Sequence, residues 1–286
     1  MITLRSHEEL AKLEEASRVV LETLDVVERA VAPGITTEEL DSIAEGEIRR
    51  RGARPAFVGY RGYPKTLCTS VNDEVVHGIP GKRSLKEGDI VGVDCGAVVD
   101  GYFGDAARTI PVGRIDAERA RLLRVTRQAL DAGIAAARPG ARVSDIGAAV
   151  EAVAIVNGYG VVRDFVGHGV GTALHEEPQV PNYGPGGRGL LLKAGMVIAI
   201  EPMFNLGRAE VTVDKDRWTV RTRDKSVSAH FEYTVALLPE ATVVLGRGEF
   251  PLVVHERGTS RSPEPAHSER GTSRSPEPPG AAAVGA

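Results

Sequence analysis

Two aspartates near the middle of the sequence are placed by a turn signal so that they can share a cation. Asp94 and Asp105 stand on either side of Asp100-Gly101, and Asp-Gly between β-type runs is a strong signal for a two-residue hairpin turn. Folding there pairs Gly96 with Asp105, which makes the two aspartates diagonal neighbours with β-carbons about 7–8 Å apart or less. Carboxylates this close on a buried face repel each other, and a divalent cation removes the conflict. Two aspartates on a solvated face remain the alternative on this evidence alone.

Three further residues extend this set of candidate ligands. His168 lies within Gly167-His-Gly-Val-Gly171, whose glycines allow backbone or ligand to approach closely, although a lone histidine is more often structural. Glu201 ends the apolar run Met196–Ile200, and Glu232 lies where strand alternation can point it inward. Oxygen-rich ligation with one imidazole suits Mn, Fe, Co or Zn, and bridging carboxylates indicate a dinuclear site with ions about 3.5–4 Å apart.

The elements that would position these residues occur in two similar halves. A Pro-Gly pair followed by a helical pattern occurs twice at an interval of 106 residues: Pro33-Gly34 before 38–51, and Pro139-Gly140 before 144–157. The apolar segment that ends at Asp94 resembles the segment that ends at Glu201, 107 residues later. Two matches at nearly one interval predict a duplication in which a carboxylate ends each strand. Chance similarity is the alternative, because Lys-x-Gly before a strand is common.

Helix caps and strand patterns together predict an α+β fold. Ser6 and Thr36, each three residues before a glutamate, are expected to form capping boxes, and Asp116 is expected to cap a third helix. Strands are expected over the following ranges: 90–99, 102–112, 161–166, 196–200 and 231–238. We therefore expect helices segregated onto one face of a curved, largely antiparallel sheet.

Composition limits the classes of partner. Among 286 residues, 35 Lys and Arg against 39 Asp and Glu give a net charge of -4, which argues against nucleic acid as the main ligand. Cys68 and Cys95 form no paired motif, so we expect no disulfide framework. The first fifteen residues lack the apolar core of a signal peptide, and no apolar run approaches the roughly 20 residues that span a bilayer. We expect a cytoplasmic protein without a membrane partner.

The last part of the chain differs in composition from the rest. Glu256–Pro265 recurs as Glu269–Pro278, and Gly, Ser, Pro and Ala dominate the segment. Such a segment buries too little apolar surface to offset its ordering entropy. We therefore predict a catalytic domain over residues 1–250 and a disordered low-complexity tail over 251–286. A Pro-rich partner motif is the alternative for the tail.

The order Asp94, Asp105, His168, Glu201, Glu232 is that of the metal ligands in the pita-bread metallopeptidases, and the surrounding motifs resemble type I methionine aminopeptidase. These motifs are Gly62-Tyr-Pro-Lys65, Cys68-Thr-Ser-Val-Asn72, His77-Gly-Ile-Pro80, Asp100-Gly101, Gly167-His-Gly169, His175-Glu-Glu-Pro-Gln-Val180, Ile200-Glu-Pro-Met203 and Trp218-Thr-Val220. The resemblance covers residues 2–246. It implies the pita-bread fold, with two pseudo-symmetric halves and a curved antiparallel sheet covered by helices.

The resemblance also implies the activity, which is hydrolytic removal of the initiator methionine when the second residue is small. The expected partners are the N-termini of nascent polypeptides near the ribosome, and the expected state is a monomer. An X-Pro peptidase of the same fold is one alternative, although the chain before Asp94 is too short for the extra domain of that class. A non-catalytic pita-bread binding protein is the other, although such relatives lose ligands.

The resemblance implies two divalent metal ions, which could be Co, Mn, Fe or Zn, and it implies a role for each residue at a matching position. Asp94 would bind one ion and His168 with Glu201 the other, while Asp105 and Glu232 would bridge them. Glu201 would accept the proton of the attacking water, His175 would stabilise the oxyanion, and His77 would contact the substrate. The remaining substrate-binding residues are those that resemble the lining of a methionine side-chain pocket, namely Tyr60, Tyr63, Cys68 and Trp218. Leu174 stands where many relatives carry an aromatic residue, which predicts a softer pocket wall.

Truncation after Phe250 should leave both peptide hydrolysis and the melting temperature nearly unchanged, because the removed segment lacks core residues. Thermal melting and peptide hydrolysis of the full and truncated chains measure this. A truncated protein that does not fold would show that the tail packs.

Overall fold

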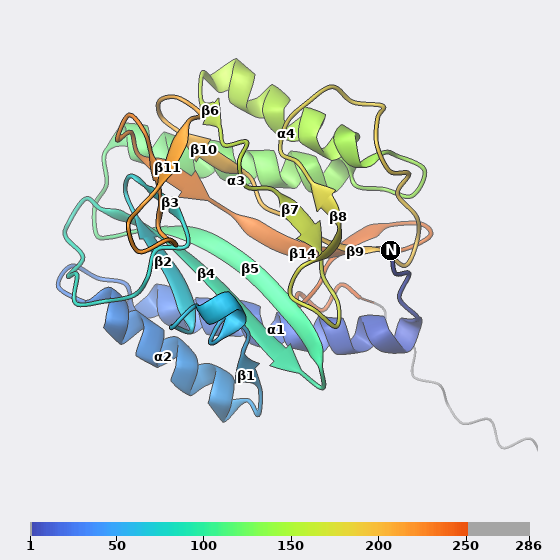
Figure 1. The fold of residues 1–286 in the computed structure, drawn as a ribbon, viewed down its shortest axis with the longest axis horizontal. Coiled ribbons are helices and arrows are strands. Elements are labelled where there is room, and N and C mark those ends of the chain that lie inside the picture. Colours follow the sequence, from blue (N-terminus) through green and yellow to red (C-terminus); the bar gives the residue numbers. More distant parts are fainter. Residues whose placement is uncertain (1, 251–286) are drawn as a thin grey trace, which may run out of the picture. The chain divides into compact units, whose positions relative to one another are not determined.

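The computed structural model describes residues 2–250, and this part of the chain is α+β (Figure 1). Its helices are α1 (His7–Ala30), α2 (Thr37–Arg50), α3 (Ala117–Ala136) and α4 (Val143–Asn157), with a short 3-10 helix at Tyr60–Gly62. Its strands are β1 (Arg54–Pro55), β2 (Leu67–Val71), β3 (Glu74–Val76), β4 (Ile90–Val99), β5 (Tyr102–Pro111), β6 (Gly160–Val161), β7 (Gly167–Gly169), β8 (Glu176–Val180), β9 (Val197–Ile200), β10 (Met203–Asn205), β11 (Val211–Val213), β12 (Val220–Thr222), β13 (Ser228–His230), β14 (Glu232–Leu237) and β15 (Thr242–Val244). None of these helices is long and apolar enough to cross a membrane. The predicted tail over 251–286 lies outside the described residues.

The predicted helix caps are confirmed. Ser6 and Thr36 each accept a hydrogen bond from the backbone of the glutamate three residues later, and each glutamate accepts one in return. The Asp116 carboxylate accepts from the backbone of Arg119 at the start of α3. These contacts satisfy backbone N–H groups that have no partner within the first turn of a helix.

The largest sheet is antiparallel and carries the predicted hairpin. Its strand order is β1-β4-β5-β14-β9-β7-β8, with β2 added to β4 and β15 added to β14. The register of β4 and β5 pairs Val99 with Tyr102 and Gly96 with Asp105, as the Asp-Gly turn predicts. The strand expected over 161–166 is wrong, because β6 ends at Val161. Arg163 and Asp164 are exposed there, and the chain turns before it enters β7.

The duplication predicted from the sequence is repeated in the backbone hydrogen bonds. Gly34 donates to the carbonyl of Leu85 at 2.8 Å, and 106 residues later Gly140 donates to the carbonyl of Leu192 at 3.0 Å. Both glycines have positive φ, at 100° and 89°, a conformation that side chains with a Cβ disfavour. Each half therefore places a helix and a following strand in the same way.

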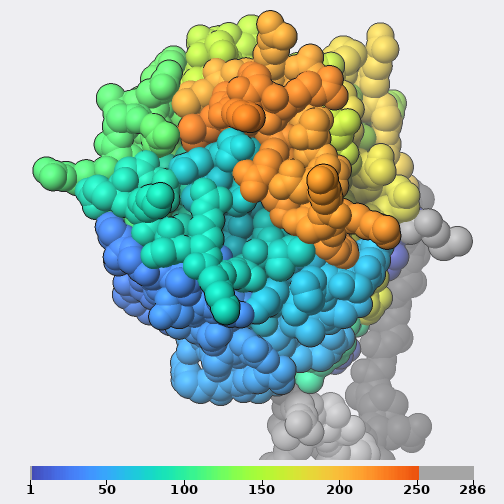
Figure 2. Space-filling view, turned by 60° about the vertical axis from the view of Figure 1, so that its left-hand side comes forward, coloured from blue at the N-terminus to red at the C-terminus, as the bar shows by residue number. Residues whose placement is uncertain are grey.

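The helices of each half pack beside the strands of that half. Helices α1 and α2 lie below the sheet in Figure 1, where α1 contacts β4 and β5, and α3 and α4 lie above. The small sheet β11-β12-β3 joins the halves because β12 pairs with β3. In Figure 2, segments of both halves, cyan to teal and orange, accordingly abut on one face.

Replacing Gly104 by alanine should destabilise the fold, because α1 crosses β5 closely at this position. A Cβ there would lie 2.6 Å from the backbone of Ala16 and Ser17, and overpacking of this kind costs about 1–3 kcal/mol. We expect a melting temperature several degrees below that of the unmodified chain. Gly46→Ala is the control, since a Cβ there meets nothing within 4 Å and alanine favours a helix. Equal melting temperatures for both variants would contradict the close approach.

Candidate metal centre

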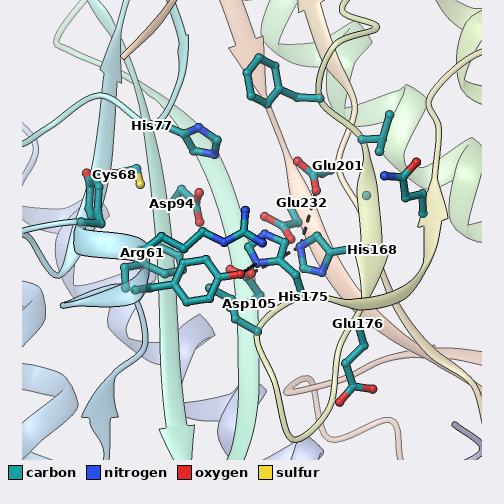
Figure 3. A pocket seen from close by; sticks show the side chains of 18 of the residues that line it. Arg61, Cys68, His77, Asp94, Asp105, His168, His175, Glu176, Glu201 and Glu232 are labelled. Carbon is teal, nitrogen blue, oxygen red and sulfur yellow. Dashed lines mark hydrogen bonds and ion pairs between the residues drawn. The ribbon is translucent and has the colours of Figure 1, made fainter. Parts of the chain in front are cut away.

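A cavity of about 590 Å³ collects all eleven candidate site residues (Figure 3). The five candidate ligands lie on strands or directly after one: Asp94 on β4, Asp105 on β5, His168 on β7, Glu201 after β9 and Glu232 on β14. The six candidate substrate residues also line the cavity, namely Tyr60, Tyr63, Cys68, His77, His175 and Trp218. The structure therefore brings together groups that are separated by up to 172 residues in the sequence.

Sheet register places the carboxylates on a common face. Glu232 pairs with Ala107, and Ala107 pairs with Asp94 on the other side of β5. Asp105 stands two residues before Ala107, so its side chain points to the same face of the sheet. Asp105 and Glu232 are buried, and ligand atoms of these two residues and His168 all lie within 4.8 Å of one another.

The local backbone orients the His168 imidazole. Its Nδ1 lies 2.9 Å from the carbonyl oxygen of Gly169, so Nδ1 carries the proton and donates. The lone pair of Nε2 then faces carboxylates, 3.8 Å from Asp105 and 3.7 Å from Glu201. A ring nitrogen fixed in this way is the usual arrangement for a histidine that binds a metal.

Glycines on both sides of His168 allow β7 to pack closely. A Cβ on Gly167 would lie 2.3 Å from the carbonyl oxygen of Ala199, and one on Gly169 would lie 2.3 Å from that of Glu177. Any larger residue would separate β7 from β9 and β8. The glycines that flank His168 in the sequence therefore serve strand packing around the imidazole.

Among the described residues, no lysine or arginine forms an ion pair with the four carboxylates, of which Asp105 and Glu232 are buried and Asp94 and Glu201 partly buried. Burial raises the pKa of Asp94 to about 7, and burial followed by mutual repulsion raises the pKa values of Asp105, Glu201 and Glu232 well above their usual range. In the described part of the chain, Asp105 and Glu201 lie near histidines only, at 3.7–3.8 Å. Burial lowers the pKa of His168 to about 4, so this imidazole is neutral at pH 7.

Several carboxylate oxygens in the cavity have no hydrogen-bond partner, which bears on whether these residues can bind divalent cations. One carboxylate oxygen each of Asp94, Asp105 and Glu232 is buried without a hydrogen bond, although buried polar atoms normally have a partner. A neutral imidazole nitrogen and several unpaired carboxylate oxygens are the ligands that divalent transition metals take. The residues present therefore fit a metal centre.

Two histidines face the centre from different elements. His175 Nδ1 lies 2.8 Å from the hydroxyl oxygen of Tyr60, and its ring centroid lies 4.1 Å from that of His168. His77 has a positive φ of 60° and packs edge-on against Phe165 and Trp218. Burial lowers the pKa of His77 to about 4 and that of His175 to about 3, so both are neutral at pH 7.

The wall next to the carboxylates is apolar. Tyr63, Cys68 and Leu174 are buried in one cluster with Phe57, and Trp218 packs against it. The hydroxyl of Tyr63 is already committed, because it donates to the carbonyl oxygens of Leu67 and Gly78 at 2.9 and 3.1 Å. This wall offers rings, a thiol and aliphatic groups to a ligand.

Sequence reasoning missed His230, which is buried beside Glu201. Its Nε2 lies 3.7 Å from a carboxylate oxygen of Glu201 and has no hydrogen bond. The only signal was its position two residues before Glu232, and this signal is weak because His230 ends β13 whereas Glu232 begins β14. Phe57 and Phe165 also line the cavity, but nothing in their sequence context distinguishes them from core residues.

Comparison with known proteins places the chain in a family. The model of metallopeptidase family M24 matches residues 11–238, and the chain belongs to this family. Methionine aminopeptidase of Clostridium acetobutylicum is 48% identical over 246 residues, which cover 86% of this chain and 98% of that protein. A crystal structure of methionine aminopeptidase from Rickettsia prowazekii superimposes with a TM-score of 0.85 at 41% identity, covering 86% of this chain and all of the other.

These relatives confirm the predicted resemblance to methionine aminopeptidases and the pita-bread fold. A prolidase structure from Pyrococcus furiosus has a TM-score of 0.70 at 24% identity, and this chain covers only 66% of it. That likeness shows the fold alone. The X-Pro peptidase alternative is therefore not favoured.

The rise in melting temperature on adding Mn²⁺ to chelated protein should be larger at pH 8 than at pH 5. The carboxyl pKa values are raised on folding, so without a cation their ionisation is increasingly opposed as the pH rises from about 4 through about 7. A cation binds the ionised carboxylates, and a carboxyl group that is protonated at pH 5 no longer binds it. Thermal melting at both pH values measures this, with Asp105→Asn as a variant expected to lose most of the rise. An equal rise at both pH values would contradict the assignment.

Proposed function

We propose that the chain is a methionyl aminopeptidase that uses two divalent metal ions to hydrolyse the first peptide bond of protein chains. The observation that carries this proposal is the set of four carboxylates and one imidazole that lines one cavity beside an apolar wall. Asp105, His168 and Glu232 of this set are buried. The relatives at 48% and 41% identity bear the same activity in their names. A binding protein without catalysis would have no use for uncompensated buried carboxylates, which oppose folding.

The roles of the ligand residues are those that the resemblance to methionine aminopeptidases implies. Asp94 would hold one ion, His168 and Glu201 would hold the other, and Asp105 and Glu232 would contribute to both. Co, Mn, Fe and Zn all suit these ligands. The chemistry that such ions supply is a lowered pKa of a shared water and polarisation of the scissile carbonyl.

The remaining steps belong to side chains of the chain. Glu201 accepts the proton as water attacks, and it passes the proton to the departing amine. His175 donates a hydrogen bond to the developing oxyanion from Nε2, because its Nδ1 faces Tyr60 and is occupied there. His77 contacts the substrate amide, and its ring is fixed by Phe165 and Trp218.

The apolar wall would select the methionine side chain. Rings and sulfur are polarizable and make favourable contacts with a thioether, and Tyr63, Cys68 and Trp218 offer such groups. Tyr60 contributes its ring and orients His175. Leu174 is buried in this wall, and its aliphatic side chain is the basis for expecting a softer wall here.

The setting of the enzyme is also a proposal. We infer a monomer in the cytoplasm that acts on nascent chains near the ribosome. The two cysteines are free and buried, as a reducing compartment allows, and the arginines of α2 are paired with glutamates such as Glu45 and Glu47. Residues 1–250 would be the catalytic domain, followed by the low-complexity tail.

The direct test is hydrolysis of Met-Ala-Ser after chelation and re-addition of single metals. We expect release of methionine from Met-Ala-Ser, much slower release from Met-Leu-Ser because a larger second side chain crowds His77, and little hydrolysis of Ala-Pro peptides. Glu201→Gln should reduce turnover by orders of magnitude, since a neutral amide does not accept the proton and ligates poorly. Equal rates on the two methionyl peptides, or normal turnover by the variant, would refute the proposal.

Metal titration should separate the roles of the two neighbouring histidines. His168→Ala removes a ligand, so excess metal should restore part of its activity. His175→Ala removes an oxyanion donor, which typically costs about 10²–10³ in turnover, and it should bind metal normally yet stay slow at any metal concentration. Turnover and thermal melting of both variants across a metal titration measure this. Rescue of His175→Ala by metal would show that the roles are exchanged.

A further inference from the structure

A partly buried ion pair joins the N-terminal segment to the loop that carries His175. Arg5 donates from Nη2 to both carboxylate oxygens of Glu176, at 2.7 and 2.5 Å. The Arg5 side chain is 5% exposed and that of Glu176 is 19% exposed, so water screens the pair weakly. These residues lie 171 positions apart and belong to different halves of the duplication.

The Glu176 carboxylate also binds the backbone of the His175 loop. One of its oxygens accepts hydrogen bonds from the N–H groups of Thr172 and Ala173, at 2.8 and 3.2 Å. Figure 3 shows the Glu176 side chain directed away from the candidate metal ligands, although its backbone is adjacent to His175. The side chain therefore fixes the loop without entering the reaction.

Arg5 is itself held firmly at both ends. Its backbone N–H donates to the carbonyl of Gly195 at 2.7 Å, and its guanidinium contacts the Glu9 carboxylate at 3.3 Å. Glu9 belongs to the capping box of α1 and also accepts from the hydroxyl of Tyr102. The start of α1 therefore serves as the fixed support for the loop.

Gly171 provides the space for this contact. A Cβ on Gly171 would lie 1.8 Å from Arg5 Nη2 and 2.5 Å from a Glu176 oxygen. The third glycine of the His168 motif therefore admits the arginine rather than a substrate or a phosphate. The Gly171 carbonyl in turn accepts from the backbone of Phe103 on β5 at 2.9 Å.

We propose that Arg5 and Glu176 are positioning residues that hold His175 where it can donate to the oxyanion. This rests on the proposed function. The His175 ring is held by Tyr60, and the loop that leads into His175 is held by Glu176 through the N–H groups of Thr172 and Ala173. His175 is otherwise exposed. A donor that moves by about 1 Å can lose about a hundredfold in rate, so the anchor matters more for turnover than for substrate binding.

The test is the kinetics of the metal-loaded full chain on Met-Ala-Ser. Arg5→Ala should lower kcat by about tenfold to a hundredfold, with KM and metal affinity little changed. Arg5→Lys should recover part of the loss, because lysine keeps the charge. Glu176→Gln keeps the side-chain shape but removes the ion pair, and it should lower kcat in the same way even if Arg5→Ala folds poorly. Arg18→Ala is the control, since this arginine also pairs with glutamates from α1 but on the exposed helix surface.

A double-mutant cycle with His175→Ala shows whether Arg5 affects turnover through His175. If Arg5 acts through His175, Arg5→Ala should have no further effect on turnover per folded molecule when His175 is absent. Equal fold losses in both backgrounds, or an unchanged kcat in Arg5→Ala and Glu176→Gln, would overturn the positioning role. A wild-type enzyme that leaves Met-Ala-Ser intact would overturn the proposed function and this inference together, whereas an active wild type with unaffected variants overturns this inference alone.

Discussion

The concentration of buried negative charge in one cavity is the constraint on which the rest of the structure depends. Four carboxylates line this space, and burial raises their pKa values. Such groups oppose folding unless a cation pairs with them, and lysine or arginine would fill the position that a metal requires. The chain instead supplies a neutral imidazole whose free nitrogen faces the carboxylates. The free energy that these carboxylates cost on folding is therefore offset only when a cation binds between them.

The duplicated framework explains how carboxylates from distant segments converge. Each half carries a Pro-Gly turn, a helix and a strand in equivalent hydrogen bonding. The sequence predicted a carboxylate at the end of each strand. Glu201 does follow β9 directly, but for Asp94 the prediction is wrong, because this residue lies in the middle of β4. The two equivalent strands, β4 and β9, lie in one sheet on either side of β5 and β14, so the carboxylates of both halves reach the same cavity. The halves are then locked together by β3 with β12 and by Arg5 with Glu176, so the distance between the sets is fixed by contacts outside the cavity.

The features that could be predicted from the sequence are those that depend on residues close together in the chain. The capping boxes at Ser6 and Thr36 and the register at Asp100-Gly101 follow from neighbouring residues, and all three are confirmed. The expected strand over 161–166 failed because Val162 and Phe165 flank an exposed Arg-Asp pair, and apolar composition alone does not reveal a turn. Arg5 carried no signal at all, since its partner lies 171 residues away. His230 did carry a weak signal, in its two-residue spacing from Glu232, but only once Glu232 was known to face inward.

The register of β2 on β4 places the apolar wall of the cavity beside a candidate metal ligand. Cys68 pairs directly with Asp94 across these strands, so the apolar wall and the first candidate ligand are adjacent residues in the sheet. If β2 shifted by one residue along β4, the side chains of Cys68 and Asp94 would lie on opposite faces of the sheet. The distance between the side-chain pocket and the hydrolytic centre is therefore set by a ladder of backbone hydrogen bonds rather than by flexible loops. A fixed distance of this kind suits an enzyme that removes a single N-terminal residue, because the peptide bond to be cleaved lies at a constant distance from the side chain that is recognised.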